Sequence, residues 1–258
     1  MFRPAKPSFA PAVLPDRDWG SLKLNAGRKN KNKILAGLSK TDTALLQPLL
    51  TPVDLPVRKL LEARGRRIEQ VYFLDSGLAS IVASGGTNHS IEIAIVGREG
   101  MSGLPILMST DRSPHETFMQ SAGLGWRIAA ADLSAAMSQS ATLRERLLQY
   151  AHTVAVQMGF TALSNGRYKL EERLARWLLM ALDRSDDNAV ALTHEFLAVM
   201  LGTRRPGITT ALNVLEKSGL IESRRGLVKI LNRGALEETA NGSYGAAEAE
   251  YTRLFGVA

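Results

Sequence analysis

The sequence predicts an α+β chain in which a small β domain comes first and a small helical domain last. Hydrophobic residues alternate in short runs over residues 53–129, and they recur every three or four positions from residue 130 onward. Near residue 202, two short helical patterns flank a glycine, and a basic hairpin pattern follows them. A chain of 258 residues with 45% hydrophobic residues is long enough to bury cores of this kind.

Composition narrows the function classes. The chain has no cysteine, which excludes disulfides, iron–sulfur clusters, thiolate zinc sites and cysteine nucleophiles, and fits a cytoplasmic protein. No apolar run reaches about 18 residues, so no transmembrane helix is expected. Prolines interrupt the first 15 residues, and a secretory signal is not expected there either.

Basic charge is unevenly distributed. The net charge is +7, and residues 1–33 hold eight Lys or Arg against two Asp. We expect residues 1–32 to form a basic, Pro-rich flexible arm, which is either a solubilising tail or a DNA-binding arm. Residues 203–233 hold seven Lys or Arg against two Glu within a folded pattern. This second segment is the expected phosphate-contact surface.

The β-rich region opens with a helix that Ser39 caps, with Asp42 three residues later. Val71–Leu74 and Leu78–Val82, separated by a turn at Gly77, predict a hairpin. A further turn precedes the alternating run Ser90–Val96, and strand character returns over residues 117–128. Such evenly spaced short strands indicate a sandwich, jelly roll or barrel.

A long helical region is predicted to follow, from Leu133 to a break at Asn165–Gly166. One apolar stripe runs along it, with the residues Leu143, Leu147, Tyr150, Val154, Met158 and Thr161. The stripe is either ordinary core contact or a dimer seam, because its spacing is close to that of a coiled coil. Another helix is predicted from Leu170 to Leu182.

Residues 192–221 predict a helix-turn-helix. Thr193 can cap a short first helix, and Gly202 can supply the tight turn. Thr203 can cap a second helix, whose first turn tolerates Pro206. The predicted buried faces are Phe196, Leu197, Met200 and Leu201 on the first helix and Ile208, Ala211, Leu212 and Leu215 on the second.

Exposed residues at the start of the second helix predict DNA binding. Arginine can donate two hydrogen bonds to guanine, and threonine can contact a phosphate or the methyl group of thymine. Residues 222–231 predict a hairpin with basic residues, which is typical of a winged variant. The predicted DNA-binding residues are Thr203, Arg204, Arg205, Thr209, Thr210, Arg224, Arg225 and Lys229.

The order of these parts resembles the Crp/Fnr superfamily of bacterial transcription regulators, most strongly over Thr193–Ile221. The resemblance implies a cyclic-nucleotide-binding-type β-roll or jelly-roll effector domain at residues 33–132. It also implies a long dimerisation helix at 133–165 and a C-terminal winged helix-turn-helix domain at 166–258. Arg205 stands where the family reads a guanine. Pro206 and Thr210 replace a glutamate and a basic residue of the family, so the half-site need not be the usual one.

The effector pocket departs from the family's pattern. Cyclic-nucleotide binders of the family have a glutamate in a glycine turn and a later Arg-Ser/Thr-Ala motif. The corresponding turn is Gly100, Met101, Ser102 and Gly103, so methionine replaces the glutamate. Our alignment places His115 and Glu116 at the arginine and hydroxyl positions. A carboxylate repels a phosphate, so the pocket is expected to be degenerate and the usual response to cAMP absent.

The resulting prediction is a homodimeric regulator that binds a pseudo-palindromic DNA operator, with half-sites about 34 Å apart. Contact with RNA polymerase is a further expectation, and no cofactor, metal, membrane or enzymatic activity is expected. One alternative is a regulator of the same fold without an effector. Another is a sensing or interaction module whose helical domain binds protein. Haem binding by His89, His115 or His152 is a further alternative, but no ligand pattern accompanies these residues.

Overall fold

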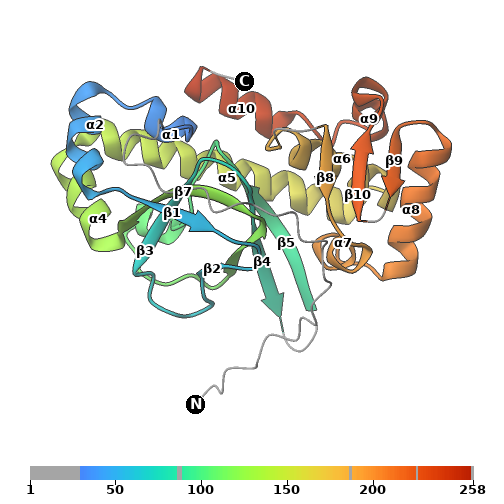
Figure 1. Cartoon of the computed structure of the whole chain (residues 1–258), viewed down its shortest axis with the longest axis horizontal. Coiled ribbons are helices and arrows are strands. Elements are labelled where there is room, and N and C mark those ends of the chain that lie inside the picture. Colours follow the sequence, from blue (N-terminus) through green and yellow to red (C-terminus); the bar gives the residue numbers. More distant parts are fainter. Residues whose placement is uncertain (1–29, 86–88, 186–187, 225, 257–258) are drawn as a thin grey trace, which may run out of the picture.

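The computed structural model describes residues 30–85, 89–185, 188–224 and 226–256 (Figure 1). The β domain contains two antiparallel sheets within these residues, with strand orders β1-β7-β3 and β2-β6-β4-β5. The strands are β1 (Thr51–Leu55), β2 (Leu60–Glu62), β3 (Gln70–Leu74), β4 (Leu78–Gly85), β5 (His89–Val96), β6 (Glu116–Ser121) and β7 (Gly123–Ala129). The helices around them are α1 (Lys33–Ala36), α2 (Lys40–Leu46), the 3-10 turn η1 (Gln47–Leu49), α3 (Leu104–Leu107) and α4 (Ala130–Gln139).

The predicted fold class is confirmed, but one predicted hairpin is wrong. β3 pairs with β7, and β4 pairs with β5 and β6, so β3 and β4 lie in different sheets. The segment between them is a corner at which the chain crosses from one sheet to the other. Gly77 has a φ of +82°, and a Cβ there would lie 2.9 Å from the carbonyl oxygen of Ala122. The glycine marks this close approach to the β6–β7 connection and does not close a hairpin.

The predicted long helix consists of two helices. Ser140 has an extended backbone, with φ −127° and ψ 114°, and its hydroxyl accepts a hydrogen bond from the N–H of Leu143. It therefore ends α4 and caps α5 (Ala141–Arg167). The predicted break at Asn165–Gly166 is also wrong, because α5 continues through both residues to Arg167. A glycine one residue from a helix end costs only about 1 kcal/mol relative to alanine, which packing readily offsets.

The apolar stripe of α5 belongs to the core of the chain. Leu143, Leu147, Tyr150 and Val154 are buried against the β domain, together with Phe73 and Met101. A dimer seam formed by this stripe is therefore excluded. The opposite face of α5 is exposed, and it includes Leu148 and Leu163.

The C-terminal domain packs against the end of α5 (Figure 1). Its core is formed mainly by side chains of α6 and α8, including Leu174, Leu178, Ile208 and Leu212. The elements are α6 (Leu170–Leu182), β8 (Ala189–Ala191), α7 (His194–Met200), α8 (Arg205–Lys217), β9 (Ile221–Arg224), β10 (Leu227–Ile230) and α9 (Arg233–Thr239).

The last helix leaves this domain. α10 (Ala246–Phe255) packs along α5, and Phe255 is buried in the core of the β domain. The domain predicted at residues 166–258 therefore includes a segment that packs elsewhere. No helix in the described parts of the chain is long and apolar enough to span a lipid bilayer.

Candidate nucleic-acid interface

The turn between α7 and α8 has the predicted geometry. The hydroxyl of Thr193 accepts a hydrogen bond from the N–H of Phe196 at 3.2 Å and so caps α7. Gly202 has a φ of +57°, and a Cβ there would lie 2.7 Å from Cδ1 of Ile91 on β5. The positive φ favours glycine at this turn, and the missing Cβ leaves room for the Ile91 side chain.

The second helix begins later than predicted. α8 starts at Arg205 with Pro206 in its first turn, and Arg204 holds the cap position without a side-chain hydrogen bond. The predicted cap at Thr203 is wrong, because the N–H of Thr203 bonds to the oxygen of Ala198 at 2.8 Å and still belongs to the turn. The predicted inner face is confirmed, with Ile208, Ala211, Leu212 and Leu215 buried.

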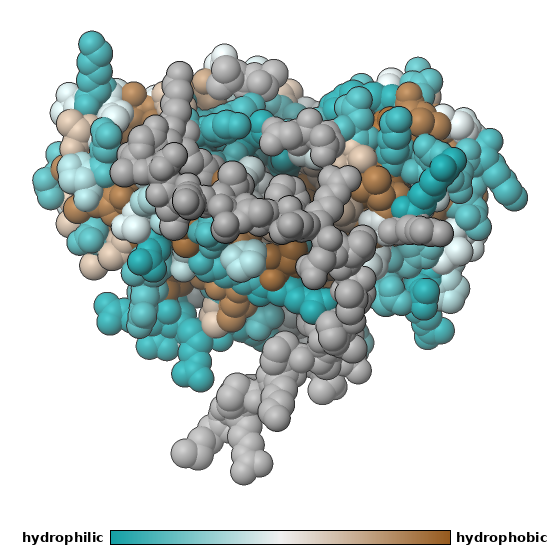
Figure 2. All heavy atoms as spheres, viewed as in Figure 1, coloured by the Kyte–Doolittle hydropathy of each residue, from teal (hydrophilic) through white to brown (hydrophobic). Residues whose placement is uncertain are grey.

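The predicted DNA-contacting side chains of α8 face outward. Arg204, Arg205 and Thr210 are exposed, and Thr209 is partly exposed. Figure 2 shows mainly hydrophilic side chains over the end of the molecule that α8 and β9 form. An exposed helix start with two arginines can enter the major groove of B-DNA, while the buried inner face holds the helix in place.

Two residues of α7 that the sequence analysis did not single out contact these side chains. Glu195 Oε1 lies 2.9 Å from Nη1 of Arg205. His194 Nδ1 lies 3.0 Å from Oγ1 of Thr209, and this hydroxyl also donates to the oxygen of Arg205 at 3.2 Å. Their position in the sequence could have indicated these contacts, because the residues that directly follow the cap Thr193 lie beside the start of the next helix.

The predicted wing is a three-stranded sheet of order β8-β10-β9. β8 was not predicted, and it pairs through Val190 opposite Val228. Arg224 and Lys229 are exposed, and Nη2 of Arg224 lies 2.5 Å from Oε1 of Glu222. Arg225 lies outside the described residues. The exposed cations of the wing can contact phosphates.

The glycine turn of the predicted effector pocket is fully engaged with the protein itself. Met101 is completely buried, its N–H donates to the hydroxyl of Tyr150 at 3.0 Å, and this hydroxyl donates back to the oxygen of Met101 at 2.9 Å. Ser102 Oγ accepts from the N–H of Tyr72, and the N–H of Gly103 donates to Glu62. A Cβ on Gly100 would lie 2.4 Å from the Tyr150 hydroxyl oxygen, so glycine is needed at this contact.

The charges near this turn disfavour a phosphate. Glu62 is buried, and burial raises the pKa of this carboxyl despite its hydrogen bonds with Gly103 and Thr117. The pKa of His115 is lowered by burial and by the positive charge of Arg64, which favours the neutral imidazole. Glu116 begins β6 opposite Val82. None of these three groups supplies a permanent positive charge that could bind a phosphate.

An Arg-Ser pair lies three residues before the positions that our alignment chose. Ser113 is buried, and its hydroxyl accepts from the N–H of His115 at 3.1 Å. The Arg112 side chain is exposed, lies 3.8 Å from Asp111 and donates to the oxygen of Gly65 at 3.2 Å. Arg112–Ser113 has the first two letters of the Arg-Ser/Thr-Ala motif, although the Arg112 side chain is solvent-exposed.

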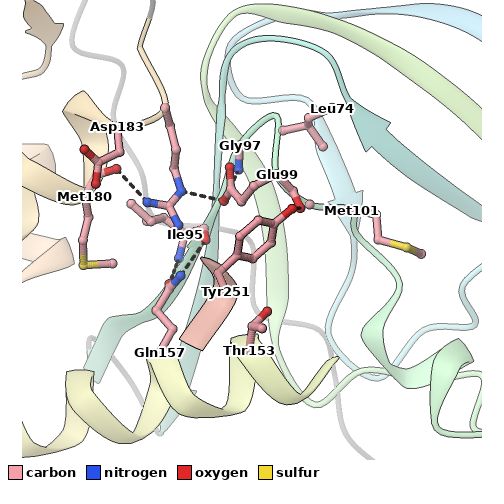
Figure 3. A network of polar contacts seen from close by, with 12 residues as sticks. Leu74, Ile95, Gly97, Glu99, Met101, Thr153, Gln157, Met180, Asp183 and Tyr251 are labelled. Carbon is pink, nitrogen blue, oxygen red and sulfur yellow. Dashed lines mark hydrogen bonds and ion pairs between the residues drawn. The ribbon is translucent and has the colours of Figure 1, made fainter. Parts of the chain in front are cut away.

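Buried polar contacts join the β domain to the C-terminal domain. Nε of Arg184, just after α6, lies 2.6 Å from Oε1 of Glu99, which precedes the glycine turn. Trp177 Nε1 donates to Glu92 on β5 at 2.6 Å. Figure 3 shows Glu99 between Gly97 and the α10 residue Tyr251, whose hydroxyl donates to the oxygen of Glu99 at 2.9 Å. The turn, α5, α6 and α10 thus meet in one network.

Among the described residues, no group of three or more His, Asp or Glu could hold a metal ion. The exposed arginines of α8 can contact DNA through charge and hydrogen bonds.

Comparison with known proteins agrees with this architecture. Residues 172–239 match the family model of the Crp-like helix-turn-helix domain. No curated protein matches the chain. A solved structure from Eubacterium rectale, named as a transcriptional regulator of the crp/fnr family, has a TM-score of 0.65 and 19% identity over 83% of this chain and 100% of its own.

Two further solved structures have the same fold. A CRP-family transcriptional regulator from Thermus thermophilus has a TM-score of 0.64 and 18% identity, covering 75% of this chain and 99% of its own. FixK2 from Bradyrhizobium japonicum has a TM-score of 0.62 and 16% identity, covering 74% and 96%. At these identities the solved structures show that this chain shares their fold. Residues 172–239 are a Crp-like helix-turn-helix domain, and the chain as a whole has the fold of the solved Crp/Fnr-type structures.

Proposed function

We propose that the chain is a homodimeric, sequence-specific regulator of transcription that acts in the cytoplasm and does not respond to cAMP. The exposed start of α8 carries this proposal, because Arg204 and Arg205 project from a helix whose opposite face is buried. Thr203, Thr209 and Thr210 lie beside them, and Arg224, Arg225 and Lys229 of the wing supply phosphate contacts. Contact with RNA polymerase stays a prediction.

The open face of α5 supports the homodimer. Positions 148, 155, 159, 162 and 166 are exposed and follow one another in steps of seven, four, three and four, which fits a heptad spacing, whereas His152 contacts Glu250 of α10 at 2.8 Å. Leu148 and Leu163 are 42% and 44% exposed on this face. Added Cβ atoms on Gly159 and Gly166 would meet nothing within 4 Å. A second copy of α5 can therefore approach closely along this face.

The dimer is tested by Leu148→Asp and Leu163→Asp, with Leu60→Asp as a matched control, since Leu60 is 51% exposed on β2. Sedimentation should show monomers for the first two variants and dimers for the control and the wild type. Dimers in all four proteins would contradict dimerisation through this face of α5.

A specific observation favours a regulator without a cyclic-nucleotide effector. Met101 is 0% exposed and its backbone polar groups are both bonded to Tyr150, so the turn has no free donor at this residue for a ribose or phosphate. The buried Glu62 carboxyl binds the next glycine of the turn. A phosphate would have to displace these bonds without gaining a buried cation.

The function is tested by measuring affinity for DNA upstream of the protein's own gene over a salt series, with and without cAMP. We expect a footprinted site and a steep fall of affinity with salt, because phosphate contacts release counterions. Addition of cAMP should change neither. Binding only with cAMP would contradict the degenerate pocket, and binding that no salt concentration weakens would contradict a DNA interface.

A further inference from the structure

We propose that His194 is a positioning residue for sequence recognition, and that it makes Thr209 present its methyl group to the DNA. The half-site would then contain a thymine close to the guanine that Arg205 contacts. This inference rests on the proposed function and adds the chemistry of a second recognised base. The inference starts from two polar contacts of the Thr209 hydroxyl, which lies 3.0 Å from His194 Nδ1 and 3.2 Å from the backbone oxygen of Arg205.

The hydrogen count assigns the direction of both bonds. A threonine hydroxyl has one hydrogen, and that of Thr209 is donated to the oxygen of Arg205. The contact with His194 then requires Nδ1–H as the donor. With its hydrogen used inside the protein, the hydroxyl has none left for a phosphate oxygen or a base acceptor.

These bonds also fix the rotamer of Thr209. A β-branched side chain is stiff at χ1, and two partners for its oxygen hold a single orientation. The methyl group is then the part of this partly exposed side chain without a polar partner. Thr209 lies four residues after Arg205 and therefore on the same face of α8. Contact between a threonine methyl and the C5 methyl of thymine is an established mode of base recognition.

Thr210 provides a comparison within the same helix turn. Its hydroxyl donates to the oxygen of Pro206 at 3.1 Å, and among the described residues no bond to α7 accompanies it. The substitution Thr210→Ser therefore makes the same chemical change one residue further on, without touching the contact with His194.

The experiment uses the full chain and duplexes that it enriches from a random-sequence pool. Each thymine of an enriched duplex is replaced in turn by uracil, which removes only the C5 methyl group. Binding is compared for the wild type, Thr209→Ser, Thr209→Val, His194→Ala, His194→Asn and the control Thr210→Ser. We expect one thymine in each half-site whose replacement weakens wild-type binding about fourfold, the effect of one buried methyl group.

The variants separate methyl recognition from hydroxyl recognition. Thr209→Ser should lose the same factor and become insensitive to uracil at that position, whereas Thr209→Val and Thr210→Ser should stay sensitive. His194→Ala should lose the sensitivity, and His194→Asn should restore it because its side-chain amide supplies a donor.

Other outcomes overturn the inference. It is wrong if no uracil effect depends on residue 209, if Thr209→Val behaves like Thr209→Ser, or if His194→Ala keeps the wild-type pattern. Failure of the proposed function looks different: the pool yields no enriched sequence, or Arg205→Ala enriches the same sequences as the wild type. Either result would overturn sequence-specific recognition itself and the inference with it.

Discussion

The same chemical pair occurs in two regions of the molecule with opposite surroundings. Arg205 and Glu195 meet at 2.9 Å at the proposed DNA-binding surface, where their side chains are 65% and 56% exposed. Arg184 and Glu99 meet at 2.6 Å between the two domains, where the exposed fractions are 8% and 16%. Water competes with the first pair, which can open when a base approaches, and is largely excluded from the second.

The difference shows how the chain divides two tasks. The buried pair lies beside other contacts between distant elements, such as Trp177 to Glu92 and Tyr251 to the backbone of Glu99, and these contacts hold the elements together. The exposed pair joins Glu195 of α7 to Arg205 of α8, and in the proposed function Arg205 exchanges this partner for DNA. Mutations in the buried pair should therefore change the free energy of unfolding, and mutations in the exposed pair should change the affinity for DNA.

The largest effect should follow from Arg184→Ala. Removal of the arginine leaves Glu99 with a largely buried, unpaired charge, and such changes cost about 3–5 kcal/mol. Arg205→Ala, the matched control at the surface, should cost less than about 1 kcal/mol. Urea unfolding of both variants measures the two free energies. Equal losses would show that the burial difference between the two pairs has no energetic consequence.

Glu92 should make stability depend on pH. Burial raises the pKa of this carboxyl to about 7, although hydrogen bonds with Ser80 and Trp177 and the charges of Arg176 and Arg184 lower it. The folded state thus binds a proton that the unfolded state, with a pKa near 4.5, releases earlier. The stability that this group contributes is complete below pH 4.5 and is lost as the pH rises through about 7.

The test compares wild type with Glu92→Gln, which keeps an acceptor for the indole N–H of Trp177 but cannot ionise. The difference in unfolding free energy between the two proteins should change by about 3 kcal/mol between pH 4.5 and pH 8, in favour of the variant at high pH. Glu116→Gln, on a partly exposed carboxyl, serves as control. A pH-independent difference for Glu92→Gln would mean that Glu92 does not titrate in this range.

At the exposed region, Arg205→Ala should change DNA recognition instead of folding. We expect a loss of about 1–3 kcal/mol in binding to the preferred sequence and relaxed specificity at one base pair, because a bidentate contact to guanine is removed. Affinities for the preferred duplex and for its single-base variants measure both effects. If all duplexes lost affinity equally, Arg205 would be a phosphate contact.

The two regions also differ in how far the sequence could predict them. Thr193, Gly202 and the apolar faces of α7 and α8 lie within one short stretch, and each has a local signal in a cap, a turn or a periodicity. The network around Glu99 joins residues up to 152 positions apart, so no local pattern indicates it. The pairing of β3 with β7 also joins distant residues, so the local pattern around Gly77 wrongly suggested a hairpin. The packing of α10 against the β domain is equally distant in sequence and was not predicted.

The smallest effect should come from the wing. Lys229 is exposed on β10, and a lysine that contacts one phosphate contributes about one unit to the slope of log affinity against log salt concentration. Lys229→Ala should therefore lower this slope by about one and weaken all sequences to a similar degree. Lys217→Ala is the control, because Lys217 is also exposed but lies at the opposite end of α8 from Arg205. A slope that Lys229→Ala leaves unchanged would remove this residue from the interface and confine the phosphate contacts of the wing to its arginines.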